Sequence, residues 1–179
     1  PQGIFMPIFI AEATAIAQQK GSVEGLDDVA FMGADGILSP AFLEDVPESG
    51  GFYFSGPDLR FGENTNEVTD VNATDFLAAY EAEYNEAPTA PFWAHAYDAT
   101  TMLLKAIDTV AVQDGDTLYI DRQALRDELY RTSGFSGIIG TLTCDEFGDC
   151  GAAKITVIKH EPGSDYATST ENVIFSYAP

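Results

Sequence analysis

The first third of the chain contains short apolar runs that are separated by helix-forming stretches. The apolar runs predict buried strands at residues 4–10 and 29–33 and a third strand at residues 51–55. Residues 12–20 are rich in alanine and predict a helix that stops at Gly21, and residues 40–44 begin with a proline and predict a short second helix. This alternation predicts an α/β fold with a parallel, doubly wound sheet.

The apolar pattern lapses between residues 57 and 71, where acidic and amide side chains predict a loop or crossover. Three helices are expected beyond it: one that begins near Asn72 or Thr74, either of which can cap it, one over 92–109 and a charged one over 122–131. On the second of these helices we expect one stripe at helical spacing: Trp93, Ala96, Tyr97, Thr100, Leu104 and Ile107.

The last part of the chain predicts strands again. Residues 137–142 and 154–159 alternate or run apolar, and we expect two strands joined by a loop that carries both cysteines. Residues 172–176 predict one more strand. The chain opens on a buried strand with no start signal before it, and we therefore expect an earlier part of a larger fold to precede it.

The charge of the chain limits its partners. Eight Lys and Arg residues stand against 29 Asp and Glu residues, which gives a formal net charge of -21 and a pI near 4.1. The acids are dispersed along the chain, so they predict a solvated acidic surface. Such a surface repels phosphate groups, which argues against nucleic acid and anionic membranes as partners.

Two cysteines, Cys144 and Cys150, flank a short acidic segment that contains Gly148. Their spacing favours a disulfide that clips a hairpin, and such a bond is typical of an oxidising compartment. A zinc site is the rival, but it needs two further ligands, and His95 and His160 lie far away in sequence. Free thiols are the third alternative. The disulfide interpretation favours an exported protein.

Catalytic motifs are scarce, and no cofactor is implied. The chain has no phosphate-binding glycine loop, no H-E-x-x-H and no G-x-S-x-G. His95 and Asp98 share one helix face, which is more often structural than catalytic. The acids of the cysteine loop, Asp145, Glu146 and Asp149, could approach a calcium ion, but a plain acidic turn is favoured because calcium needs six to eight oxygens. We therefore expect no metal site and no enzyme.

The ends of two predicted strands carry the more interesting side chains. In open α/β sheets, ligands bind beyond the carboxyl ends of parallel strands. Phe9 and Glu12 follow the first strand, and Asp35 follows the second. Phe9 could cover an apolar ligand body, and Asp35 could pair with an ammonium group. Equally, Phe9 could belong to the core, and Asp35 could simply precede Gly36 in a turn.

Several segments, taken together and in this order, resemble a known family. They are Ile4-Phe-Met-Pro-Ile-Phe-Ile-Ala-Glu12, Phe31-Met-Gly-Ala-Asp-Gly36, Gly51-Phe-Tyr-Phe-Ser-Gly-Pro57, Ala96-Tyr-Asp-Ala99 and Gly137-Ile-Ile-Gly-Thr-Leu-Thr-Cys-Asp-Glu-Phe-Gly-Asp149. This series is similar to the C-terminal portion of type I periplasmic binding proteins, in the branch of the branched-chain amino-acid receptors of ABC transporters.

The resemblance implies two α/β lobes that close over a ligand. Residues 1–56 would be part of the second lobe, residues 57–153 would return to the first lobe with the cysteine hairpin, and residues 154–179 would cross back. Phe9, Asp35 and Glu12 would then contact the ligand. Asp35 replaces the longer Glu of the best-known receptors and Phe9 replaces Tyr, so the resemblance does not imply leucine itself.

The same resemblance implies a function. The chain would belong to an extracytoplasmic solute-binding protein that binds an amino acid or related solute and delivers it to an ABC permease, in the periplasm or outside the cell, with a lipid anchor possible in the full-length parent. A sensor of the same fold and an acidic hydrolase using His95 and Asp98 are the alternatives. Because the groups that hold the ligand carboxylate belong to the other half, we expect weak or no binding by this piece. Its unpaired sheet edge favours self-association.

Overall fold

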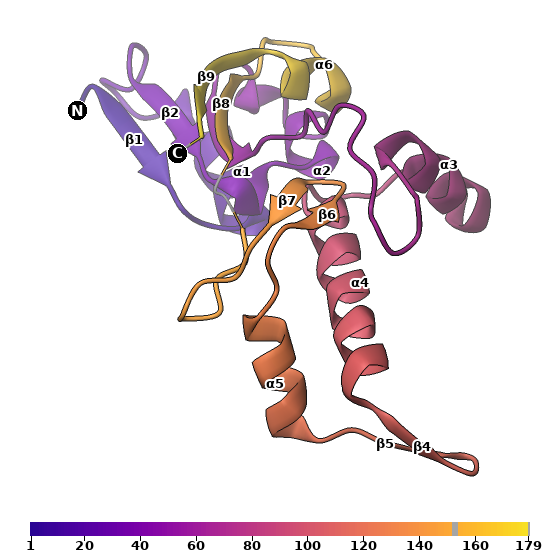
Figure 1. Cartoon of the computed structure of the whole chain (residues 1–179). Coiled ribbons are helices and arrows are strands. Elements are labelled where there is room, and N and C mark those ends of the chain that lie inside the picture. The colour runs from indigo at the N-terminus through magenta and orange to yellow at the C-terminus, as the bar shows by residue number, and fades with distance from the viewer. Residues whose placement is uncertain (152–153, 179) are drawn as a thin grey trace. The chain divides into compact units, whose positions relative to one another are not determined.

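The structure, a computed structural model, describes residues 1–151 and 154–178 (Figure 1). The chain folds into two compact units. Unit 1 comprises residues 1–59, 88–91 and 153–179, and unit 2 comprises residues 60–87 and 92–152. The chain therefore leaves unit 1, builds unit 2 and returns to unit 1 near its end. The assignment of the segments to two lobes stays a prediction.

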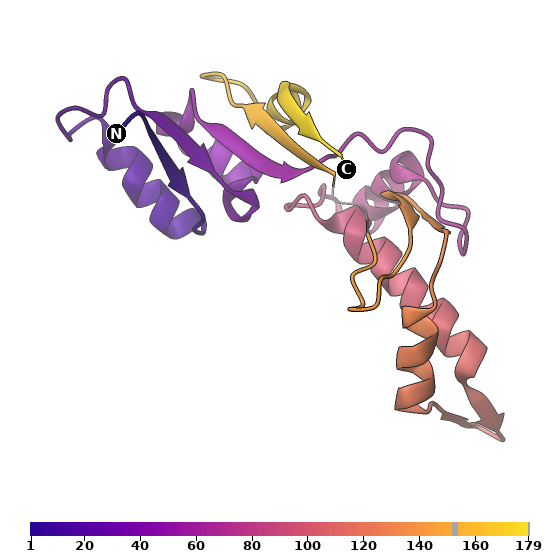
Figure 2. The same cartoon turned by 60° about the vertical axis from the view of Figure 1, so that its left-hand side comes forward.

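Unit 1 is built on a five-stranded sheet with the order β1-β2-β3-β8-β9 (Figure 2). Its strands are β1 (Gly3–Met6), β2 (Ala30–Gly33), β3 (Tyr53–Pro57), β8 (Ile155–Lys159) and β9 (Val173–Tyr177). The first three strands are parallel, while β8 and β9 are antiparallel to their neighbours. The α/β prediction is thus confirmed, with a sheet that is parallel where strands and helices alternate.

The core of unit 1 lies on one face of this sheet. Phe31, Phe52 and Phe54 point to that face and are almost completely buried. The rings of Phe31 and Phe52 stack with centroids 5.0 Å apart, and Phe42 meets the edge of Phe54 at 5.9 Å. Each such burial contributes about 1.5–3 kcal/mol. Short helical elements complete this layer: α1 (Ile10–Lys20), η1 (Asp35–Ile37), α2 (Pro40–Leu43), η2 (Pro47–Ser49) and α6 (Tyr166–Glu171).

Helix α6 was not predicted from the sequence, although its cap is recognisable. Asp165 accepts a hydrogen bond from the backbone N–H of Thr168 at 2.8 Å, which is the usual role of an aspartate at a helix N-terminus. Ser169, on the same helix, lies 2.7 Å from Nδ1 of the buried His160. These contacts hold the short helix against the end of β8. A helix this short is marginal by itself, so packing is what stabilises it.

Unit 2 contains three helices and two small hairpins. They are α3 (Ala73–Tyr84), α4 (Trp93–Val110), α5 (Arg122–Tyr130), β4 (Val112–Asp114) with β5 (Thr117–Tyr119), and β6 (Phe135–Gly137) with β7 (Gly140–Leu142). Asn72 caps α3 by accepting from the N–H of Asp75, so of the two predicted caps the first is the one used. The hairpin of β4 and β5 was missed, because its short strands are exposed and carry no apolar alternation.

Two predictions about unit 2 and the cysteine loop were wrong. Residues 137–142 are not one strand, because Gly137 and Gly140 bracket a two-residue turn between β6 and β7, and Gly140 has a φ of 123°. The strand that follows the cysteine loop, β8, does not pair with β7 but with β3 and β9 in the other sheet. The loop therefore joins two sheets and is not the turn of a hairpin.

The predicted stripe of α4 is not its most buried face, although Trp93 and Tyr97 of that stripe pack against Phe76. The residues of this helix that are buried are Ala94, Asp98, Thr101, Met102 and Ala106, whereas Leu104 is 55% exposed. Small side chains, Met102 and a hydrogen-bonded acid occupy the buried face, so hydrophobicity alone does not indicate it. Among the described residues, none of the helices combines the length and the apolar character that crossing a membrane requires.

Candidate functional site

The carboxyl ends of β1 and β2 lie at the same edge of the sheet, because the two strands are parallel and in register from Gly3 and Ala30 onward. The loop after β1 leads into α1, and the turn after β2 leads into η1. A backbone hydrogen bond of 3.3 Å from Ala34 to Met6 joins the two strand ends. The segments that carry Phe9 and Asp35 are therefore neighbours.

Phe9 lies at the N-terminus of α1 with its side chain 73% exposed. The interpretation of Phe9 as a core residue is therefore wrong. One edge of its ring faces Gly36, since a Cβ added to that glycine would lie 3.2 and 3.3 Å from two carbons of the ring and 3.1 Å from the carbonyl of Ile8. Contacts this tight leave little room for any side chain at position 36, so a glycine there lets the two segments approach.

Asp35 begins η1 on the surface, next to this contact. Its Oδ1 accepts a hydrogen bond of 3.1 Å from the backbone N–H of Gly36. Asp35 is therefore a turn residue, as one interpretation predicts, and the described residues supply it with no ion-pair partner. A turn residue with an exposed, unpaired carboxylate can still bind an external cation, so its role toward a ligand stays a prediction.

Glu12 lies in the first turn of α1 and is exposed. An acid at this position is favourable because the N-terminus of a helix carries partial positive charge. The helix explains Glu12 without a ligand, and its ligand contact also stays a prediction. Sequence reasoning missed the contact between Phe9 and Gly36. Its only signal in the sequence was that a glycine follows Asp35 at the end of the strand.

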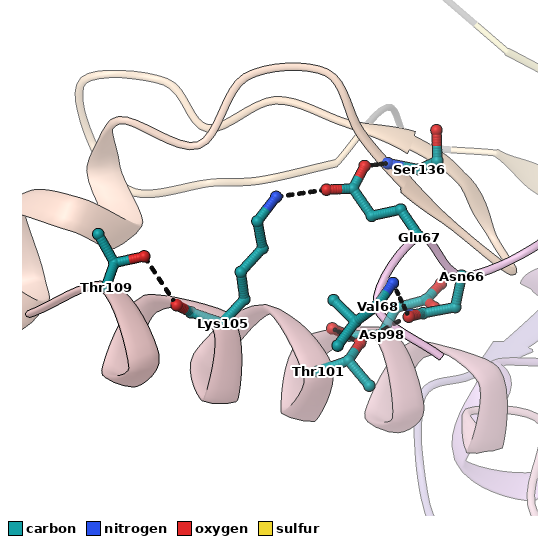
Figure 3. A network of polar contacts seen from close by, with 8 residues as sticks. All are labelled: Asn66, Glu67, Val68, Asp98, Thr101, Lys105, Thr109 and Ser136. Carbon is teal, nitrogen blue, oxygen red and sulfur yellow. Dashed lines mark hydrogen bonds and ion pairs between the residues drawn. The ribbon is translucent and has the colours of Figure 1, made fainter. Parts of the chain in front are cut away.

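Asp98 belongs to a polar network in unit 2 that includes Asn66 and Thr101 (Figure 3). Its carboxylate is completely buried and accepts hydrogen bonds from the N–H groups of Ile138 and Ile139, both at 2.9 Å, and from Nδ2 of Asn66 at 2.8 Å. The same Asn66 amide reaches Thr101 at 2.7 Å. This acid holds the β6–β7 turn and the loop of residue 66 to α4.

A second carboxylate extends this network toward the surface. Glu67 forms an ion pair with Lys105 of α4 and accepts the backbone N–H of Ser136 at 2.8 Å (Figure 3). The hydrogen bond from Lys105, with that from Ser136, lowers the pKa of Glu67. Glu67 thus attaches β6 to α4, as Asp98 attaches the β6–β7 turn, and both roles are structural.

The structure gives His95 and Asp98 different surroundings. The Nδ1 atom of His95 is buried and has no hydrogen-bond partner among the described residues, and the rings of Phe61 and Phe92 lie against it. Burial lowers the pKa of His95, and the negative charge of Asp98 only partly offsets this. The oxygens of Asp98 accept hydrogen bonds from backbone and amide donors, so this carboxylate is not placed to orient the His95 ring.

Cys144 and Cys150 form the disulfide that their spacing favours. Within their loop, Oδ1 of Asp145 accepts the N–H groups of Phe147 and Asp149 at 2.8 and 2.9 Å, so this acid closes a turn. Among the residues that the structure describes, no group of three or more His, Cys, Asp or Glu side chains is placed to hold a metal ion.

Solved structures share this arrangement, although no protein-family model and no curated protein matches the sequence. A leucine-binding protein from Thermotoga maritima matches all of this chain with a TM-score of 0.71 and 24% identity. The fold is that of a type I periplasmic binding protein. This chain spans 45% of the length of that structure.

Other structures with the type I periplasmic binding protein fold carry different ligands. A solute-binding protein from Rhodopseudomonas palustris in complex with benzoate matches all of this chain, over 44% of its own, with a TM-score of 0.64 and 14% identity. A substrate-binding protein from Desulfitobacterium hafniense in complex with Leu matches 92% of this chain, over 42% of its own, with a TM-score of 0.60 and 22% identity. The fold is therefore shared across ligand classes.

Proposed function

We propose that the chain supplies one side of the ligand site of an extracytoplasmic solute-binding protein, which serves an ABC importer and binds a branched-chain or related amino acid between two lobes. The observation that carries this proposal is the contact between Phe9 and Gly36, beside the unpaired carboxylate of Asp35. It lies at the edge where parallel strands end, which is where ligands of open α/β folds bind.

The chemistry of this edge favours a ligand with a positive group. The exposed ring of Phe9 offers an apolar surface, and Asp35 can accept charge-assisted hydrogen bonds from an ammonium group. Glu12 adds a second negative charge on the first turn of α1. An aromatic acid such as benzoate has no positive group to offset these carboxylates, so we propose an amino acid for this chain.

Delivery of the solute to a permease breaks no bond, which agrees with the structural roles of Asp98 and His95. The partner in this proposal is the membrane-embedded permease, and the location is the periplasm or the cell exterior. The disulfide supports that location, because such bonds persist in oxidising compartments. A lipid anchor belongs to the proposal only for the full-length parent.

Three small ligands test the proposal on this chain. Leucine has both charged groups, 3-methylbutylamine lacks the carboxylate, and 4-methylpentanoate lacks the amine. In an NMR titration we expect the first two to shift the amides of residues 9–12 and 34–36 with Kd values weaker than about 1 mM. 4-Methylpentanoate should not shift these amides, because it lacks the amine that Asp35 is proposed to bind.

Asp35→Asn should remove these shifts, whereas Asp108→Asn, at an exposed acid of α4, should leave them unchanged. Equal shifts from the amine and the carboxylate, or shifts that survive Asp35→Asn, would contradict the proposed site. Thermal-shift screening of amino acids on the full-length parent then identifies the physiological ligand, because a ligand that binds the native state raises Tm.

A further inference from the structure

The loop that leads into α3 carries a sequence motif that the proposed ligand site does not use. Asn72-Ala73-Thr74 has the form Asn-x-Ser/Thr without a proline between, which is the acceptor motif for N-linked glycans in exported proteins. Among the asparagines of the chain, only Asn72 is followed two residues later by a serine or threonine. The motif therefore marks a single position.

An acid precedes this motif at a defined distance. Asp70 stands two residues before Asn72, and bacterial transferases of N-linked glycans require an acid at that position. Asp70 is exposed, has a φ of 56° and donates its N–H to the carbonyl of Asn66 at 2.8 Å. Asn66 donates its own N–H to the carbonyl of Val71 at 2.9 Å. These two bonds form a tight turn that presents the acid on the surface, next to the acceptor motif.

The two polar atoms of the Asn72 side chain have different surroundings. Oδ1 accepts the N–H of Asp75 at 2.9 Å and caps α3. Nδ2 has no acceptor among the described residues, and it is not one of their buried, unpartnered atoms, so solvent reaches it. Thr74, whose hydroxyl a transferase recognises together with the amide, is exposed as well. The fold thus uses the oxygen and leaves the nitrogen, which is the atom that carries a glycan.

We propose that Asn72 is an acceptor for an N-linked glycan. In the transfer, Nδ2 forms a bond to C1 of the first sugar of an oligosaccharide that is linked to a lipid diphosphate. The bond between C1 and the diphosphate oxygen breaks, and the lipid diphosphate leaves with its electron pair. Nδ2 gives up one proton to a base of the transferase, so no oxidant or reductant takes part.

The folded unit 2 accommodates the product. A glycosylated amide stays planar and keeps its carbonyl oxygen, so Oδ1 of Asn72 still accepts the N–H of Asp75. Every residue of α3 is at least partly exposed, so a sugar at the start of this helix displaces no core side chain. The proposal shares with the proposed function only the exported location, which the disulfide between Cys144 and Cys150 also supports.

Export of the chain into the periplasm of bacteria that carry an oligosaccharyltransferase and its lipid-linked oligosaccharide tests the site. Intact-mass spectrometry should show the mass of one glycan, and fragmentation of the glycopeptide should place it on Asn72. Thr74→Ala should abolish the modification and Thr74→Ser should retain it, because the motif requires only the hydroxyl. Asp70→Asn should abolish it with a bacterial enzyme, while asparagine tolerates the left-handed backbone at this position.

Asn72→Asp is the matched control for the fold. Asp caps helices as well as Asn does, so this variant should carry no glycan and yet melt within about 2 °C of the unsubstituted chain. Asn85→Asp, at an exposed asparagine outside the motif, should be glycosylated as the unsubstituted chain is.

An unsubstituted chain that carries no glycan, in cells that glycosylate a known acceptor protein, overturns the proposal. So does a glycan that persists in Asn72→Asp. A glycan that survives Asp70→Asn overturns the role of the acid. The NMR titrations at Phe9 and Asp35 do not depend on this motif, so its failure and that of the ligand site can be told apart.

Discussion

Two aspartates, Asp98 in unit 2 and Asp35 in unit 1, show how differently one side chain is used. Asp98 is completely buried, and both of its oxygens accept backbone N–H groups, with an amide of Asn66 as a third donor. Asp35 is exposed and accepts one hydrogen bond, from the next residue in its own turn. The first carboxylate is saturated by the protein, and the second keeps its acceptor capacity for other molecules.

This contrast separates stability from binding. A buried carboxylate without donors would be very unfavourable, so the three donors around Asp98 are required for the fold of unit 2. An exposed carboxylate loses little when it is replaced, because water solvates either state. Residues of the first kind should respond to substitution by unfolding, and residues of the second kind only by losing a ligand.

Asp98→Ala should have the largest effect. It leaves three donors without a partner, and we expect the free energy of unfolding of unit 2 to fall by about 3–5 kcal/mol. Trp93, the single tryptophan of the chain, lies on the same helix and reports unfolding in urea by its fluorescence. Asp108→Ala is the control on α4 and should cost less than about 0.5 kcal/mol. A loss below about 1 kcal/mol for Asp98→Ala would sink the structural role.

Gly137→Ala should have the next largest effect on the same network. A Cβ at this position would overlap the carboxylate of Asp98, with its Cγ only 2.6 Å away, so the acid must move from its donors. We expect a loss of about 1–3 kcal/mol in the same urea experiment. Gly151→Ala is the matched control, because its nearest neighbour, a carbon of Leu142, would be 3.9 Å away. Equal stability of the two variants would show that the β6–β7 turn adapts freely.

Acidification should destabilise both units through one histidine each. Burial lowers the pKa of His95, although the negative charge of Asp98 acts to raise it. Burial also lowers the pKa of His160, although a hydrogen bond to the backbone of Leu43 and the charges of Glu161 and Glu44 act to raise it. A folded pKa below the unfolded value favours the neutral ring, so stability is full above about pH 6.5 and falls as the pH drops below it.

Urea unfolding between about pH 7 and about pH 5 checks this dependence. His160→Gln should reduce the loss of stability of unit 1 on acidification, which the amide exchange of β8 measures. It should leave the Trp93 signal of unit 2 unchanged. The lowered pKa values of Glu67 and Asp165 act in the same direction but at lower pH, because ordinary carboxylates titrate near 4. Stability that rises on acidification through this range would contradict the buried, neutral rings.

Asp35→Asn should have the smallest effect on stability. Its one hydrogen bond is local and exposed, and an amide oxygen can accept the N–H of Gly36 equally well. We expect a change below about 0.5 kcal/mol in the unfolding of unit 1, measured by circular dichroism. A loss above about 1 kcal/mol would place Asp35 with Asp98 as a structural acid and would remove the contrast between them.

Local sequence patterns predicted the elements that carry strong local signals. The apolar runs before Gly33 and Pro57, the proline at the start of α2 and the asparagine cap of α3 mark their elements within a few residues. These signals act between neighbours in sequence, through burial of a short run or a hydrogen bond to a nearby N–H. The candidate ligand residues also came from this level, because strand ends can be recognised locally.

Long-range contacts account for the errors. The buried side of α4 follows from hydrogen bonds between Asp98 and a turn about 40 residues away, which no periodicity of the helix itself encodes. The pairing of β8 with β3 likewise joins segments about 100 residues apart. Short elements such as α6 depend on contacts of this type, and their own propensity is too weak to indicate them.

Composition, helix caps and strand ends are properties of residues close together in the chain, and they can be read before any coordinates exist. The face of α4 that is buried, the sheet that accepts β8 and the approach of Phe9 to Gly36 depend on segments that meet only after folding. Whether an aspartate is saturated or available belongs to this second group. The sequence shows the side chain, but its hydrogen-bond donors come from elsewhere in the chain. Their number is therefore set only when each unit folds.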